Sequence, residues 1–214
     1  MSDRPVSHSS ANRPPRDITP AGFFSDWLPR EFAAEFGAGK RAAADITVAV
    51  KLEGEGGGEW ILDVKGGTLL ERAPSTPGPE PMVSMTQSVA DWRALAVGED
   101  GANVDLAPPQ ASPLDVLFVD PQSRQLMNAI KGLVRFEVHG YHGRTWAMEV
   151  KFGTQAERSE PDATISVDAV TYAAILARKM APPEAYFSGK IQMRGNTSLA
   201  MQLAMGMLPR FTQK

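Results

Sequence analysis

The sequence predicts an α+β fold made of two related units, each an antiparallel or mixed sheet covered by helices. Two observations carry this prediction. Segments in which apolar and polar residues alternate with period two occur in pairs joined by glycine-containing turns, and a helix-like segment follows each pair. The hairpin pattern also returns 86 positions further on, since Val48 aligns with Val134. Such a repeat indicates an internal duplication of a supersecondary unit.

The composition narrows the class of protein. At 214 residues, the chain has room for one large domain or two small ones, and a hydrophobic content of 43% with 22% charged residues is ordinary for a globular protein. The net charge of −3 argues against a nucleic-acid partner, which would need a basic face. The chain has no cysteine, which excludes disulfides and thiolate metal sites.

The sequence also bears on location. No apolar run reaches the roughly 18 residues that a membrane-spanning helix needs. The first residues contain no apolar segment of the kind that a secretory signal requires. We therefore expect a soluble, cytoplasmic protein with at most transient membrane contact.

The N-terminal part divides into a polar segment and a helical one. Residues 1–20 hold four prolines and no periodic apolar face, so we expect a disordered tail. Apolar residues then recur at helical spacing up to residue 38, and Pro29 either divides this segment into two short helices or lies in a first turn. The apolar positions are Phe23, Phe24, Trp27, Leu28, Phe32 and Phe36.

The first predicted hairpin covers residues 46–64. Alternating apolar residues run from Ile46 to Leu52. The glycine-rich segment 54–58 turns the chain, and the return strand begins at Trp60. A phosphate-binding loop would also use a glycine run, but glutamates surround this one and no Lys-Ser or Lys-Thr follows it. The segment is therefore interpreted as a turn.

The second hairpin repeats the first. Without gaps, residues 48–72 match residues 134–158 at ten of twenty-five positions, among them Gly54/Gly140, Gly57/Gly143, Trp60/Trp146, Val64/Val150 and Glu71-Arg72/Glu157-Arg158. After each hairpin we expect a short third strand, at 82–85 and 164–167, and then a helix. Thr86 or Ser88 would cap the first of these helices and Asp168 the second.

The two units then diverge. The first continues to an apolar strand at 114–119 and a helix starting at Asp120, which closes the first unit, opens the second, or does both. We divide the chain into a tail (1–20), a divergent first unit (21–113) and an intact second unit (114–214).

The closing stretch of the chain has its own pattern. Residues 190–194 alternate as a half-buried strand, Gly195 allows a sharp exit, and Asn196 can cap the helix that follows. That helix, residues 199–208, is apolar all round, so protein or a bound molecule must cover it. Its methionines suit a surface that conforms to different partners. A plain core helix would look the same.

Two motifs carry a family resemblance. Phe-Ser-Gly-Lys-Ile-x-x-x-Gly-Asn-x-x-Leu-Ala-Met-x-Leu, residues 187–203, resembles the closing signature of the sterol carrier protein type 2 family of lipid-transfer domains. Gly-x-x-Gly-x-x-Trp-x-x-Glu-Val-Lys, residues 140–151, is similar to the opening sheet of that domain. The resemblance implies two sterol-carrier-like copies, of which the first lacks the closing motif.

The resemblance also implies a function. Domains of this family bind acyl chains, acyl-CoA, phospholipids or sterols in an apolar tunnel between sheet and helices, and they perform no catalysis. By position, the tunnel residues would be Phe136, Trp146, Met148, Phe187, Met193, Leu199, Met201, Leu203 and Met205. Such a site needs few polar contacts, because each buried CH₂ contributes about 0.8 kcal/mol.

Other classes of function have less support in the residues. The sequence contains no nucleophile elbow or dinucleotide motif, so we expect neither an enzyme nor a cofactor. Glu137, His139 and His142 could ligate zinc, but solvated turn residues explain them more simply, and we expect no metal site. The prediction is a binding or transfer protein for a lipid or other long apolar molecule, with a possible protein partner in lipid metabolism. The alternative is a ligand-free interaction scaffold.

Overall fold

The computed structural model describes residues 13–37, 43–98, 102, 104–106, 114, 117, 121–154 and 158–203. In this part of the chain, one eight-stranded sheet has the order β3-β2-β1-β4-β6-β5-β7-β8. The strands are β1 (Ile46–Glu53), β2 (Gly58–Lys65), β3 (Thr68–Arg72), β4 (Val83–Ser88), β5 (Gly132–Tyr141), β6 (Arg144–Phe152), β7 (Ala163–Asp168) and β8 (Ile191–Gly195). The predicted α+β class and the mixed sheet are confirmed.

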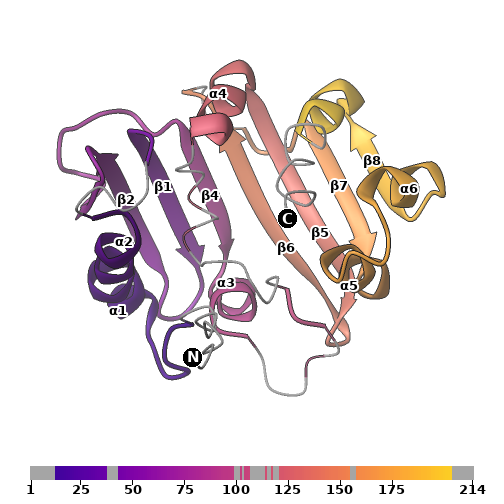
Figure 1. Cartoon of the computed structure of the whole chain (residues 1–214), viewed down its shortest axis with the longest axis horizontal. Coiled ribbons are helices and arrows are strands. Elements are labelled where there is room, and N and C mark those ends of the chain that lie inside the picture. The colour runs from indigo at the N-terminus through magenta and orange to yellow at the C-terminus, as the bar shows by residue number, and fades with distance from the viewer. Residues whose placement is uncertain are drawn as a thin grey trace, which may run out of the picture.

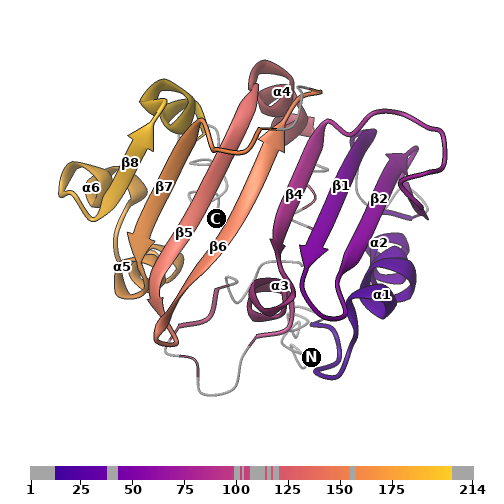
Figure 2. The same cartoon turned by 180° about the vertical axis from the view of Figure 1, so that it is seen from behind.

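The helices gather on one face of this sheet. They are α1 (Pro20–Gly22), the π-helix η1 (Phe23–Trp27), α2 (Leu28–Phe36), α3 (Val89–Ala96), α4 (Pro121–Ala129), α5 (Ala169–Leu176) and α6 (Pro182–Phe187). In Figure 1, α1 to α5 lie in front of the strands, and the view from behind in Figure 2 shows the strands in front of them. Helix α6 packs beside β8 at the sheet edge. We call the face toward the helices the inner face.

The helical segment near the N-terminus forms as predicted. Pro29 lies at the start of α2, where its missing N–H costs nothing, and the π-helix joins α2 to α1. Part of the predicted tail is folded against the molecule. Thr19 caps α1 through a 3.1 Å hydrogen bond from the Gly22 N–H, and Arg13 forms a 2.6 Å ion pair with Asp105. Residues 1–12 lie outside the described part.

The pairing of the strands repeats along the sheet. From β3 to β6, neighbouring strands pair antiparallel, antiparallel, parallel and antiparallel, and from β4 to β8 the same order recurs. Val48 pairs with Val83 on β4, and its predicted counterpart Val134 pairs with Ala163 on β7. This is the arrangement that a duplication would give. One sheet contains strands from both predicted units, so the two-unit division of the chain stays a prediction.

Three local predictions differ from the structure. Strand β3 was not expected, nor was the short helix α6, which Pro182 opens. The predicted strand at 114–119 is wrong at its described residues: Leu114 and Leu117 lie in 3₁₀ turns and both are buried.

The buried apolar residues form two clusters. The larger cluster joins η1, α2, α3 and α4 to the inner faces of β1 to β4 and parts of β5 and β6, and it includes Leu199 and Leu203 near the C-terminus. The smaller cluster joins α3, α5 and residues 104–106 to the other ends of β5 and β6. Phe136 and Met148 pack against both clusters. They mark the place where the two clusters meet.

Candidate functional site

A half-buried row of apolar side chains crosses the inner face in the second half of the sheet. Met148 on β6 pairs with Phe136 on β5, Phe136 pairs with Ile165 on β7, and Ile165 pairs with Met193 on β8. We call these four residues the apolar row. All four are only partly buried.

The row is more exposed than its surroundings on the same face. On β5, the side chains two positions before and after Phe136 are 0% and 3% exposed. On β6, the corresponding neighbours of Met148 are 6% and 1% exposed. Residues i and i±2 of a strand point to the same side, so the helical cover is thinner over the row than on either side of it.

The two ends of the row have different surroundings. Met193 lies on β8, which is the edge of the sheet. At the other end, Thr86 pairs with Glu149, which brings Gln87 to the position beside Met148. Gln87 faces inward, since it pairs with Leu52 of the larger cluster and is 8% exposed. Its side-chain oxygen is buried without a hydrogen-bond partner among the described residues.

The C-terminal helix, residues 197–203 in the described part, packs into the larger cluster close to the row. Gly195 has a φ of +76°, and the Asn196 side chain accepts a 3.1 Å hydrogen bond from the Leu199 N–H. Both predictions for this turn are confirmed. The Asp162 carbonyl accepts a 2.7 Å hydrogen bond from the Asn196 N–H, which fixes the start of the helix to the residue just before β7.

Asp162 also ties this helix to the sheet by its side chain. The carboxylate accepts a 2.8 Å hydrogen bond from the Leu133 N–H on β5 and pairs with Arg158. In this way one residue positions β5, β8 and the C-terminal helix together. The role of this carboxylate is structural.

The other side of the row is bounded by α3 and α5. Trp146 donates a 2.8 Å hydrogen bond from its indole N–H to the carbonyl of Asp91, and the Asp91 carboxylate pairs with Arg144. Tyr172 on α5 donates a 2.7 Å hydrogen bond to the carbonyl of Leu106, and burial raises the pKa of its hydroxyl. These contacts hold the smaller cluster in place.

The structure brings some of the predicted tunnel residues together and separates others. Phe136, Met148 and Met193 share the row, with Leu199 and Leu203 in the adjoining cluster. Trp146 is buried in the smaller cluster, and Met201 is 36% exposed on the C-terminal helix. Phe187 is 84% exposed at the end of α6, and Met205 lies outside the described residues.

Two residues of the site were missed at the level of sequence. Ile165 alternates within the predicted third strand and could have been assigned to the row by the same period-two argument. Gln87 follows the inward positions Val83 and Met85 and breaks their apolar pattern. A polar residue in an apolar register is itself a signal, because buried polar groups ordinarily have a partner.

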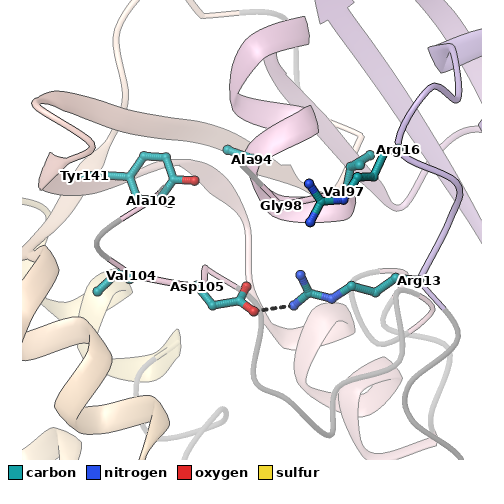
Figure 3. Close-up of a pocket in the computed structure, with 9 residues that line it drawn as sticks. All are labelled: Arg13, Arg16, Ala94, Val97, Gly98, Ala102, Val104, Asp105 and Tyr141. Carbon is teal, nitrogen blue, oxygen red and sulfur yellow. Dashed lines mark hydrogen bonds and ion pairs between the residues drawn. The ribbon is translucent and has the colours of Figure 1, made fainter. Parts of the chain in front are cut away.

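A separate hollow lies beside α3. It has a volume of about 230 Å³ and is lined by Arg13, Arg16, Ala94, Val97, Gly98, Ala102, Val104, Asp105 and Tyr141. Figure 3 shows the ion pair of Arg13 and Asp105 along one side of it. The volume is below the range of about 300–1,000 Å³ that ligand pockets usually have. None of the predicted tunnel residues lines it.

The outer face of the sheet is polar. Arg135 lies between Glu137, at 2.7 Å, and Glu149, at 3.0 Å, and the hydrogen bond to Glu137 is the main reason that the pKa of Arg135 is raised. His139 contacts Thr145 and Glu137. In the described part of the chain, no group of three His, Asp or Glu side chains is placed to hold a metal ion. The described helices include none that is long and apolar enough to span a bilayer.

Comparison with known proteins relates this arrangement to a family. Residues 114–207 match the model of the SCP-2 sterol transfer family. Hydroxysteroid dehydrogenase-like protein 2 of Rattus norvegicus is 29% identical over 89 residues, which are 39% of this chain and 17% of that protein. Sterol carrier protein 2 of Homo sapiens is 30% identical over 92 residues, 40% of this chain and 17% of the relative. The chain thus spans about a sixth of the length of these curated relatives.

A similarity to solved structures is also found, at lower sequence identity. The solution structure of the sterol carrier protein domain 2 of Helicoverpa armigera is 22% identical and covers 42% of this chain and 76% of that chain, with a TM-score of 0.34.

A mixed sheet with helices on one face, and a thinly covered apolar row beneath them, defines an α+β protein whose inner face is suited to apolar contacts. Residues 114–207, fewer than half of the chain, are the part that is similar to the SCP-2 sterol transfer family.

Proposed function

We propose that the protein binds and transfers a lipid or another long apolar molecule, which lies along the apolar row. The observation that carries this proposal is the row itself. Its four apolar side chains on the inner face remain partly exposed beside the larger cluster, and two of them, Phe136 and Met148, also pack against the smaller one. The match of residues 114–207 to the SCP-2 sterol transfer family supports the general class of ligand.

The dimensions of the row suit an extended chain. Neighbouring strands lie about 4.8 Å apart, so the row from β6 to β8 spans about 14 Å. Covering a side chain such as Phe, Met or Ile contributes about 1.5–3 kcal/mol when it goes from fully exposed to fully buried. The row residues are already partly buried, so each gains a fraction of that amount. Four such residues together still favour an alkyl chain over water.

The nature of the row also bears on selectivity. Met148 and Met193 have unbranched, flexible side chains that can repack around chains of different shape. One methylene more or less changes binding by only about 1–3 kcal/mol in an apolar pocket. We therefore expect the site to accept a range of chain lengths.

A charge placed in the row tests the proposal. Met193→Glu puts a carboxylate on the inner face of the edge strand, and Gln192→Glu puts the same carboxylate on the outer face one residue away. Delipidated protein is incubated with a panel of radiolabelled or fluorescent long-chain lipids, and uptake is measured after gel filtration. Circular dichroism confirms that both variants are folded.

The proposal expects uptake by the wild type and by Gln192→Glu, and loss of uptake by a folded Met193→Glu. Undiminished uptake by Met193→Glu would place the ligand elsewhere. A wild-type protein that takes up none of the panel would instead favour the ligand-free scaffold.

A further inference from the structure

We propose that Gln87 is the polar anchor of the apolar row and selects ligands that carry a neutral hydroxyl group at one end. The proposal rests on the function proposed above. It adds the chemical class of the ligand's polar end and names a residue outside the 114–207 segment that matches the family model.

The position of Gln87 is the first argument. Along the inner face, the row runs from Met193 through Ile165, Phe136 and Met148, and Gln87 on β4 is the next position. From β4 to β8, four strand spacings give a length of about 19 Å. A ligand chain that lies along the row with its apolar tail at β8, the edge strand, therefore brings its polar end to Gln87.

The unsatisfied amide is the second argument. The Gln87 side chain is 8% exposed, and its oxygen is buried without a hydrogen-bond partner among the described residues. A buried carbonyl without a partner costs about 1–3 kcal/mol, so such groups are rare in folded proteins. A ligand that donates a hydrogen bond to this oxygen recovers that cost. Met148, the flexible neighbour, is the side chain that must move to let the donor reach it.

The surroundings decide which donor fits. A carboxylate has no proton to donate, and burying its charge without a cation is costly. On the inner face of β6 the basic residue among those described is Arg144, which pairs with Asp91 at the far end of the strand. A hydroxyl group is neutral and both donates and accepts, so it satisfies the amide without burying a charge.

A matched pair of ligands tests this assignment. 1-Hexadecanol and hexadecyl methyl ether have the same chain and the same oxygen, but only the alcohol can donate. Their dissociation constants are measured by displacement of the neutral fluorophore Nile red from wild-type protein and from Gln87→Met, which keeps the unbranched shape. Gln192→Met, on the outer face, is the control.

We expect the wild type and the control to bind the alcohol about tenfold more tightly than the ether, which corresponds to about 1.4 kcal/mol, the strength of one good hydrogen bond. In Gln87→Met this ratio falls to about one, mainly through weaker binding of the alcohol. The thermal midpoint of the ligand-free variant is equal to that of the wild type or higher, because an unsatisfied polar group is removed.

The failures are distinguishable. If both ligands bind and the alcohol-to-ether ratio is the same in Gln87→Met as in the wild type, the anchor is refuted and the lipid site remains. If neither ligand binds the wild type, the proposed function fails and the anchor with it. A lower thermal midpoint in both Gln87→Met and Gln87→Leu would show that the amide already has a partner in the protein, and would also refute the assignment.

Discussion

The turn that docks the C-terminal helix gives the sharpest test of the structure. Gly195 has a φ of +76°, and a Cβ added there would lie 2.4 Å from the carbonyl oxygen of Asp162. Gly189, at the turn after α6, has nearly the same φ of +73°, but an added Cβ there would meet nothing within 4 Å. Replacing each glycine by alanine imposes the same conformational cost at both positions. The difference between the two variants therefore isolates the contact with Asp162.

The magnitudes follow from these geometries. An L-residue in the left-handed region costs about 1–2 kcal/mol, which is the full expected loss for Gly189→Ala. At Gly195 the 2.4 Å contact is more than 1 Å inside the usual 3.5–4.0 Å separation of non-bonded atoms, so the backbone must shift. The shift weakens the hydrogen bond from the Asn196 N–H to the same carbonyl, worth about 0.5–1.5 kcal/mol. These two terms together cost about 1.5–3.5 kcal/mol, so we expect Gly195→Ala to lose more unfolding free energy than Gly189→Ala.

Urea denaturation followed by tryptophan fluorescence measures both variants against the wild type. A displaced C-terminal helix also removes Leu199 and Leu203 from the cluster beside the row. In the absence of urea, Gly195→Ala should therefore lose lipid uptake, while Gly189→Ala keeps it. Equal losses of unfolding free energy in the two variants would refute the placement of Gly195 against Asp162.

Two further predictions concern the contacts that hold α3 and α5. In a double-mutant cycle, Asp91→Asn and Arg144→Met should show a coupling energy of about 1–3 kcal/mol, because the Asp91 side chain is only 12% exposed. Exposed ion pairs show only about 0.2–1 kcal/mol. A coupling energy near zero would contradict the ion pair. Asp168 caps α5 by accepting a hydrogen bond from the Thr171 N–H, so Asp168→Ala should cost about 1 kcal/mol at pH 7. Burial raises the pKa of Asp168, but hydrogen bonds, chiefly those from Thr171, lower it by more, so the pKa lies below its ordinary value. The cap is fully effective above the unfolded-state pKa, and the stability difference between wild type and Asp168→Ala should shrink as the pH falls through the folded-state pKa. A difference that stays unchanged through this acidic range would show that the carboxylate is not the cap.

Local patterns in the sequence predicted many of the helices and strands, but they could not predict which distant strands pair. Period-two alternation located both hairpins, and the caps at Asp168 and Asn196 follow from residue type alone. Alternation does not tell which strands become neighbours, so the joining of β4 to β6 in one sheet could not be predicted. Strand β3 was missed because it has five residues and two adjacent leucines, so its alternation is weak.

The candidate site was predictable to a similar degree. The resemblance predicted residues of the second hairpin, of which Phe136 and Met148 lie in the row, and residues of the closing motif, of which Met193 lies in the row. Phe187 belongs to the same motif, but its direction depends on α6, a helix that the sequence reading did not include. Gln87 could be assigned only after β4 was found beside β6, since nothing local links position 87 to position 148.

The shared strands explain why the first half lacks a closing motif. In the second half, β8 from the Phe-Ser-Gly-Lys-Ile segment pairs antiparallel with β7, and in the first half β6 takes the corresponding place beside β4. Conversely, β4 occupies the edge of β6 that a counterpart of β3 would need. Each half therefore completes the sheet of the other. The row is built in the same way: its apolar length comes from β5 to β8, and its polar end comes from β4, so the proposed ligand site exists only when both halves are present.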